Sequence, residues 1–247
     1  MAHFGMDRRD WLRAGALRRI NAARSPKGRH ALSSFTEFGQ GSKDAMLWEA
    51  STTIGYATVG SDGEVGRVSD LLFDDTTWRV RWIVVNTRHW FARREVVLPV
   101  SALSRLDPIR RQVAVDLTMR QIEGSPAAEE HPPVSQRAAL SENDDPHLRS
   151  VEAVVGHRVR LLDIVVGHIE ELLVDDAGWL IRYIRVDTCK WRPGDRVLLA
   201  PRSVREIDWA GRLVRFDVGC QELDALHARC DAIWIRSASH DTAPTDA

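Results

Sequence analysis

The chain has 247 residues, 44% of them hydrophobic and 28% charged, which are the proportions of an ordinary soluble globular protein. Its 34 basic and 35 acidic residues nearly cancel, so the molecule as a whole lacks the strong field that attracts DNA or acidic lipid. The three cysteines, Cys189, Cys220 and Cys230, show no CxxC spacing, which argues against a disulfide framework and against a cysteine-based zinc site. No apolar run approaches the roughly 20 residues of a membrane-spanning helix.

Residues 1–44 are predicted to form a basic tail and linker. The segment Asp7–Arg13, DRRDWLR, resembles the twin-arginine export signal, but the apolar stretch of about 7–15 residues that a signal peptide needs does not follow it. Leu12, Ala16 and Ile20 lie at helical spacing among arginines, and such a helix is able to rest on an anionic membrane. We favour a solvated tail on a cytoplasmic protein, with peripheral membrane contact through the tail as the alternative.

Residues 45–126 are predicted to form short strands joined by tight turns. Asp62-Gly63 favours a hairpin turn, because both residues readily take positive φ angles. Gly66, inside the following strand, indicates a bulge or a close approach of another backbone. A strand over 78–87 and a strand over 95–98 come next. Thr118 is expected to cap a short helix that stops at Pro126.

The second half of the chain repeats the first at a constant offset of 101 positions. The segment Leu71–Trp90, LLFDDTTWRVRWIVVNTRHW, recurs at Leu172–Trp191 as LLVDDAGWLIRYIRVDTCKW. Residues 127–150, acidic and rich in proline, are predicted to link the copies. The second copy is assigned to residues 151–230, and a polar tail to residues 231–247.

Comparing the copies predicts which face of the strand over 78–87 is buried. Ile83 and Val85 keep apolar counterparts in the second copy, whereas Val84 is matched by Arg185. The face of Ile83 and Val85 is therefore expected in the core. Arg81 lies near the end of that face, so its guanidinium needs a carboxylate or carbonyl partner.

Five or six short strands per copy, with turns every 8–12 residues, predict an all-β fold of two small β-barrels in tandem, each with a short C-terminal helix. The barrels are assigned to residues 45–126 and 151–230. We expect them to pack on each other within the chain or in a homodimer, which would cover strand edges and apolar patches.

The pattern DGEVGRVSDLLFDDTTWRVRWIVVNT, followed by EVVLP and LTMRQIEGSP, resembles the PRC-barrel family. That family is named after the H subunit of the photosynthetic reaction centre, and it includes the C-terminal domain of the ribosome-maturation factor RimM. The resemblance covers 47–126 and, less closely, 151–228, as in a stand-alone tandem member. It implies a compact barrel that docks on other macromolecules and is not itself an enzyme.

The acidic pairs Asp74-Asp75 and Asp175-Asp176 admit two interpretations. Carboxylates bind hard cations, but no further ligands follow at regular spacing, so we favour turns in which aspartate accepts backbone hydrogen bonds. The scattered histidines, His89, His157 and His168, are interpreted as structural. No Cys/His/Asp arrangement supports a nucleophile, although Cys189 lies beside Lys190. No catalytic residue, metal or cofactor is predicted.

Aromatic and basic residues supply the candidate partner surface. The loop from Arg88 to Arg94 mixes both types, and the strand face opposite the predicted core carries Trp82 or, in the second copy, Tyr183. Arginine and aromatic residues are enriched at protein interfaces. The candidate contact residues are Arg88, His89, Phe91, Arg93, Arg94, Trp82 and Tyr183. A solvated loop with one buried tryptophan is the simpler alternative, because one short patch is a weak signal for nucleic acid.

Three functions follow, in order of preference. The first is a non-enzymatic scaffold whose barrels dock a protein partner. The second is a membrane-peripheral factor related to photosynthetic or electron-transfer complexes, which rests on the basic tail and on the family resemblance. The third is an RNA-processing or ribosome-assembly factor that resembles RimM.

Overall fold

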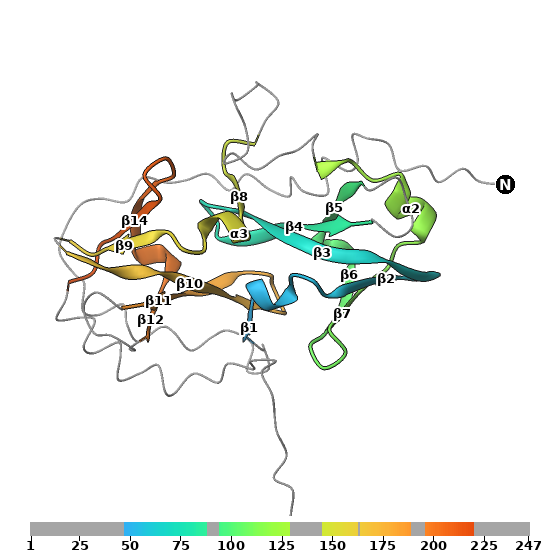
Figure 1. The fold of residues 1–247 in the computed structure, drawn as a ribbon, viewed down its shortest axis with the longest axis horizontal. Coiled ribbons are helices and arrows are strands. Elements are labelled where there is room, and N and C mark those ends of the chain that lie inside the picture. Colours follow the sequence, from blue (N-terminus) through green and yellow to red (C-terminus); the bar gives the residue numbers. More distant parts are fainter. Residues whose placement is uncertain (1–46, 88–93, 129–144, 163, 189–195, 220–247) are drawn as a thin grey trace, which may run out of the picture. The chain divides into compact units, whose positions relative to one another are not determined.

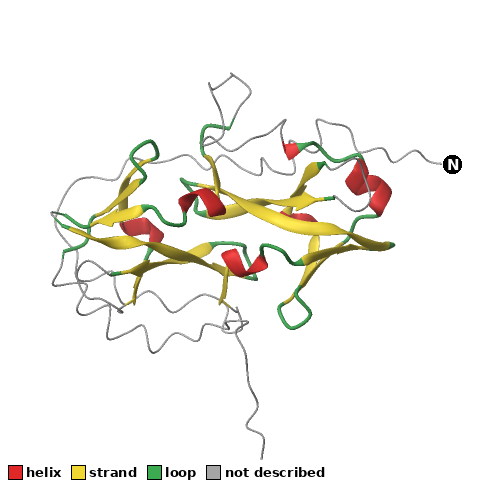
Figure 2. Cartoon of the chain, viewed as in Figure 1, coloured by secondary structure: helices red, strands yellow, loops and turns green. Residues whose placement is uncertain are grey.

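The computed structural model describes residues 47–87, 94–128, 145–162, 164–188 and 196–219. In these ranges the chain forms two seven-stranded sheets of mixed direction and a few short helices (Figures 1 and 2). The expected mainly β, tandem fold is confirmed. None of the helices in these ranges is long and apolar enough to cross a membrane.

The first sheet has the strand order β5-β4-β3-β2-β7-β6. Only the β2–β7 pair along this path is parallel. The short helix η3 (Val100–Ala102) joins β5 to β6, and α2 (Met119–Glu123) follows β7. The strands are β2 (Ala57–Gly60), β3 (Gly63–Asp74), β4 (Arg79–Asn86), β5 (Glu95–Pro99), β6 (Leu103–Asp107) and β7 (Gln112–Val115).

The second sheet has the same order, β12-β11-β10-β9-β14-β13, and the parallel pair β9–β14 lies at the equivalent place. The helix η6 (Pro201–Ser203) joins β12 to β13 as η3 joins β5 to β6. The strands are β9 (Arg158–Arg160), β10 (Val165–Asp175), β11 (Ile181–Asp187), β12 (Arg196–Leu199), β13 (Val204–Asp208) and β14 (Leu213–Phe216). Six strands per copy agree with the five or six expected.

The seventh strand of each sheet comes from the other copy. β1 (Leu47–Glu49), with η2 (Ser51–Thr53) after it, lies at the start of the first copy but pairs antiparallel with β10. β8 (Leu148–Ser150), with α3 (Val151–Val154) after it, precedes the second copy but pairs antiparallel with β3 (Figure 1). Residues 148–150, expected as the end of a linker, therefore form a strand. The crossing ties the copies together by backbone hydrogen bonds.

A reciprocal contact joins the two strand turns where the copies meet. The amide of Val80 donates to the carbonyl of Trp179 at 2.8 Å, and the amide of Ile181 donates to the carbonyl of Trp78 at 2.7 Å. Such reciprocity is the mark of a two-fold interface, here between two parts of one chain. Each tryptophan has a φ of 55° and lies in the turn, so the strand expected to start at Trp78 starts one residue later.

One hydrophobic cluster extends through both copies. Ile83 and Val85 are at most 1% exposed and contribute to it, as do Ile184 and Val186, so the predicted core face of this strand is confirmed. A smaller cluster lies on the other face of the first sheet, where Trp82 packs on it. Its buried members are Leu72, Val84, Val97 and Leu148.

Local turn and cap chemistry follows the sequence closely. The predicted hairpin at Asp62-Gly63 is present, and Gly63 has a φ of 150°, but Asp62 does not have the positive φ that was expected of it. A Cβ on Gly66 would lie 2.2 Å from the carbonyl oxygen of Asn86, which confirms the close backbone approach. The hydroxyl of Thr118 accepts from the amide of Gln121, and the Gln121 side chain accepts from the amide of Thr118, so a capping box starts α2.

Candidate functional surfaces

Most of the predicted partner loop, including Arg88, His89, Phe91 and Arg93, lies outside the described residues. Arg94 is described and is bound within the first copy. Its Nη2 donates to the carbonyl of Ser125 at 2.9 Å, and its Nη1 donates to that of Glu123 at 3.4 Å. The guanidinium therefore caps the C-terminal end of α2. It also lines a small cavity, with Val65, Thr87, Val96, Met119, Ile122 and Glu123.

The two aromatic residues of the predicted contact face are half-buried. Trp82 packs against the cluster of Leu72 and Val84, and Tyr183 lies opposite Leu173 in the β10–β11 register. Each therefore leaves only part of its ring to a partner.

The acidic turns are used internally. Asp74 accepts hydrogen bonds from the amides of Thr76 and Thr77 at 2.9 and 2.8 Å. Burial acts to raise the pKa of Asp74, but these hydrogen bonds outweigh it and hold the pKa below its usual value. Asp175 accepts from the amide of Gly178 and from Nε of Arg182, each at 2.5 Å. The turn interpretation is confirmed for Asp74 and Asp175, whereas Asp75 accepts from Nε of Arg149 at 2.7 Å.

Arg81 has the carboxylate partners that its position required. Its Nη1 contacts Asp145 and lies 3.7 Å from Asp74. Across the described ranges no group of three or more histidine, cysteine, aspartate or glutamate side chains is placed to hold a metal ion.

Two buried acids at the junction of the copies were missed by sequence reasoning. Asp70 is 8% exposed, and it accepts from the amide of Leu71 at 2.8 Å, from the hydroxyl of Ser150 at 2.5 Å and from the amide of Glu152 at 3.2 Å. Ser150 and Glu152 belong to the other copy. Burial raises the pKa of Asp70 to about 6, against the lowering effect of these hydrogen bonds.

Glu171 occupies the equivalent place in the second copy and is 2% exposed. Its carboxylate accepts from its neighbour Leu172 at 2.8 Å and from the amide and hydroxyl of Ser51, the amide at 3.1 Å. Burial raises the pKa of this side chain as well. The sequence did offer a signal for these buried acids: Asp70 and Glu171 stand at equivalent positions of two otherwise apolar strands. Each copy thus holds the lead segment of the other through a buried carboxyl group.

A cation–aromatic stack lies beside the junction of β8 with β3. The guanidinium of Arg149 sits 4.4 Å from the ring centre of Trp209, and the ring of His157 packs edge-on against the same indole at 5.7 Å. His157 is 3% exposed, and neither ring nitrogen has a hydrogen-bond partner within the described ranges. Burial and the nearby Arg212 guanidinium lower the pKa of His157. The expected structural role of this histidine agrees with its burial.

The copies differ on their outward faces. Arg158 and Arg160 of β9 replace Ala57 and Val59 of β2, and the neighbouring strand β14 carries Arg215 where β7 carries Ala114. The inward residues between them, such as Val159 and Val214, are apolar and buried. The second copy therefore presents a basic sheet face that the first copy lacks.

Comparison with known proteins identifies the first copy. A model of the PRC-barrel domain matches residues 49–120, so the chain contains one PRC-barrel domain. The region 145–216 has the same strand order but is not assigned by that model. No curated protein matches the chain.

Proposed function

We propose that the chain is a non-enzymatic binding protein in which two PRC-type barrels form one scaffold and dock a protein partner. The observation that carries this proposal is the difference between the copies. They share their core, strand order and crossed strands, yet β9 and β14 carry arginines where β2 and β7 carry Ala57, Val59 and Ala114. A fold common to both copies, with a distinct charged face on one of them, suits selective docking, because charge complementarity favours some partners over others.

Affinity capture from a lysate of the native cell tests this function. The full-length protein and a form beginning at Met46 serve as baits, and mass spectrometry identifies what each retains. We expect the same specific protein on both baits, since the scaffold lies after residue 46. Capture by the full-length form alone would place binding in the basic tail, and capture by neither would contradict the proposal.

A second candidate is a membrane-peripheral factor, and the β6–β7 turn favours it. Ile109 at this turn is 93% exposed and is followed by Arg110 and Arg111. The carboxylate of Asp107 accepts from the amide of Arg110 at 3.0 Å, which holds the turn in shape. An apolar side chain beside arginines is able to enter the headgroup region of an anionic bilayer.

If this candidate holds, Ile109→Ser should reduce co-sedimentation of the full chain with phosphatidylserine vesicles by about tenfold, because burying an isoleucine contributes roughly 1.5–3 kcal/mol. Leu162→Ser is the matched control, since Leu162 is also exposed, at 57%, but lies in the second copy. Equal sedimentation of wild type and Ile109→Ser would contradict membrane contact through this turn.

A further inference from the structure

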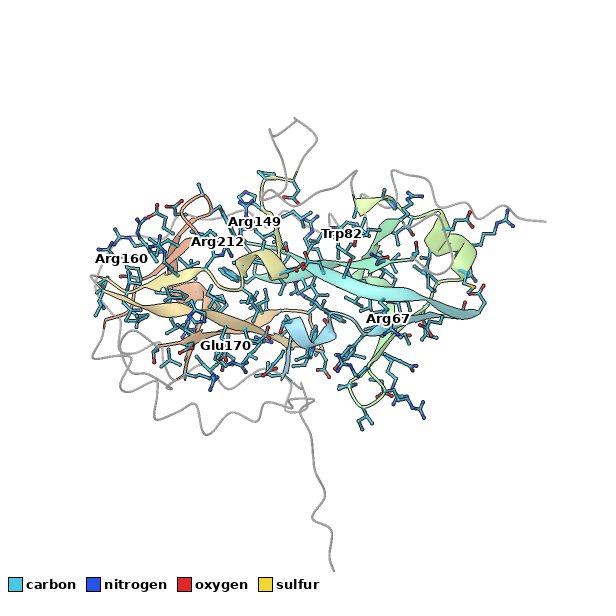
Figure 3. The ribbon with its side chains drawn as sticks, in the orientation of Figure 1. Arg67, Trp82, Arg149, Arg160, Glu170 and Arg212 are labelled. Atoms are coloured by element: carbon cyan, nitrogen blue, oxygen red, sulfur yellow. The ribbon has the colours of Figure 1, made fainter. Side chains whose placement is uncertain are left out.

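The basic face of the second copy is formed by neighbouring strands. In the parallel register of β9 and β14, Arg160 lies directly opposite Arg215. Val159 and Val214 point into the core, so these arginines point outward. Arg158 lies two residues before Arg160 on the same face. Arg205, in the irregular stretch of the adjoining strand β13, is exposed. Figure 3 shows Arg160 beside β9, away from Arg67 of the first copy.

This face is only partly neutralised within the described part of the chain, by one ion pair at Arg215. Arg215 is paired with Glu206 at 2.5 Å. No ion pair in that part of the chain involves Arg160 or Arg158, and the latter donates only to the carbonyl of Gly211 at 3.2 Å. Like charges directly opposite on neighbouring strands destabilise a sheet by a few tenths of a kcal/mol or more. An acidic ligand would relieve this repulsion.

The spacing of the arginines fits an extended peptide. Side chains two residues apart on one strand face are about 6.6 Å apart, and neighbouring strands are about 4.8 Å apart. Carboxylates at alternate positions of an extended chain have the same spacing as Arg158 and Arg160. Leu162, exposed just beyond β9, adds an apolar contact at the end of this row. An apolar contact beside charged pairs is typical of protein interfaces.

The nearby aromatic ring is not available to nucleic acid. Single-strand binders combine a basic groove with exposed aromatic faces on which bases stack. Trp209 lies in the turn between β13 and β14, but the Arg149 guanidinium covers its ring at 4.4 Å and His157 packs on it at 5.7 Å. The ring of Trp209 therefore offers these arginines no free stacking platform, which favours an acidic protein segment over nucleic acid.

We infer that the outer face of β9, β14 and β13 binds an extended acidic segment of the partner protein, whose alternate carboxylates pair with Arg158, Arg160 and Arg205. This inference rests on the proposed function and names the chemistry of its partner. The first copy does not offer this site, because Ala57, Val59 and Ser104 stand at the equivalent positions.

The test uses the full chain and a fluorescent peptide of about ten residues with alternating Glu and Ser, followed by anisotropy at low and physiological ionic strength. Arg158→Gln, Arg160→Gln and Arg205→Gln are combined in one variant. We expect binding to weaken about tenfold, because each exposed pair contributes up to about 1 kcal/mol. Salt should weaken wild-type binding as well. The control variant removes three exposed first-copy charges by Arg105→Gln, Arg110→Gln and Arg120→Gln, and should bind like wild type.

Four results would overturn the inference. One is no peptide binding by wild type, and another is equal weakening in both triple variants. The third is binding of oligouridine RNA or phosphatidylserine vesicles, instead of the peptide, that depends on the same arginines. If the second-copy triple variant still captures the wild-type partner from lysate, this inference fails while the scaffold function stands. Unchanged circular dichroism and melting temperature of the variants exclude misfolding as the cause.

Discussion

Trp48→Ala is expected to lower the free energy of unfolding by about 3–5 kcal/mol, as for other fully buried tryptophans. Trp48 lies at the start of the first copy in the sequence, but its strand pairs with β10 of the second, where it lies opposite Val174. It is 4% exposed and packs edge-on against Trp179, with ring centres 5.2 Å apart. Because one core extends through both copies, the loss should appear as a single cooperative transition at lower denaturant.

Trp48→Phe is the matched control. The indole nitrogen of Trp48 is buried and has no hydrogen-bond partner within the described ranges, so phenylalanine keeps the aromatic packing and removes an unsatisfied donor. We expect this variant to lose much less stability than Trp48→Ala. Amide exchange should show β10, and not only β1, opening more readily in Trp48→Ala. Exchange confined to the first copy would contradict the crossed arrangement.

The repeated strands and their turns were predictable because their signals are local. Asp62-Gly63 and the capping box of Thr118 and Gln121 act within a few residues of one another, and the structure contains both. Comparing the two copies showed which strand face is buried, which one copy alone does not show. Ile83 and Val85 kept apolar counterparts, and that alone identified the core face.

The crossing of the lead strands was not predictable from the repeat. β1 and β8 have three residues each, too few for a periodic signal. The repeated sequence pattern is the same whether each lead strand pairs with its own copy or with the other copy. The strand edges that the two copies offer to a lead strand are nearly identical. The choice depends on long-range contacts, such as that of Ser150 with Asp70, which no local pattern encodes.

The candidate surfaces were predicted less well than the fold. The sequence drew attention to aromatic residues next to bases, and Arg94 turned out to cap a helix. The basic face of the second copy consists of single arginines on strands that are distant in sequence, Arg160 on β9 and Arg215 on β14. Only the strand register brings them together. Buried acids such as Glu171 were hidden for the same reason, since their partners lie about 120 residues away.

Asp70→Asn should remove a large pH-dependent cost of folding. The folded pKa of Asp70 is about 6, above the usual 3.8 of an aspartate, so the folded state holds a proton that the unfolded state releases between these values. The contribution of Asp70 to stability is therefore greatest below pH 4 and is lost as the pH rises through 6. The shift corresponds to roughly 3 kcal/mol. Relative to wild type, Asp70→Asn should gain about that much stability between pH 4 and pH 7.

The comparison is made as the difference between variant and wild type in urea unfolding at each pH, so that the titration of His157 and other groups cancels. The stability difference between Glu171→Gln and wild type should change with pH in the same direction, because burial raises the pKa of that carboxyl too. The stability difference between Asp74→Asn and wild type should change with pH in the opposite direction. Hydrogen bonds lower the pKa of Asp74, so the contribution of this carboxylate to stability is lost as the pH falls. If the difference in unfolding free energy between Asp70→Asn and wild type did not change with pH, water would have to reach the carboxylate, directly or after β8 moves away. The junction would then be looser than the contacts with Ser150 and Glu152 imply.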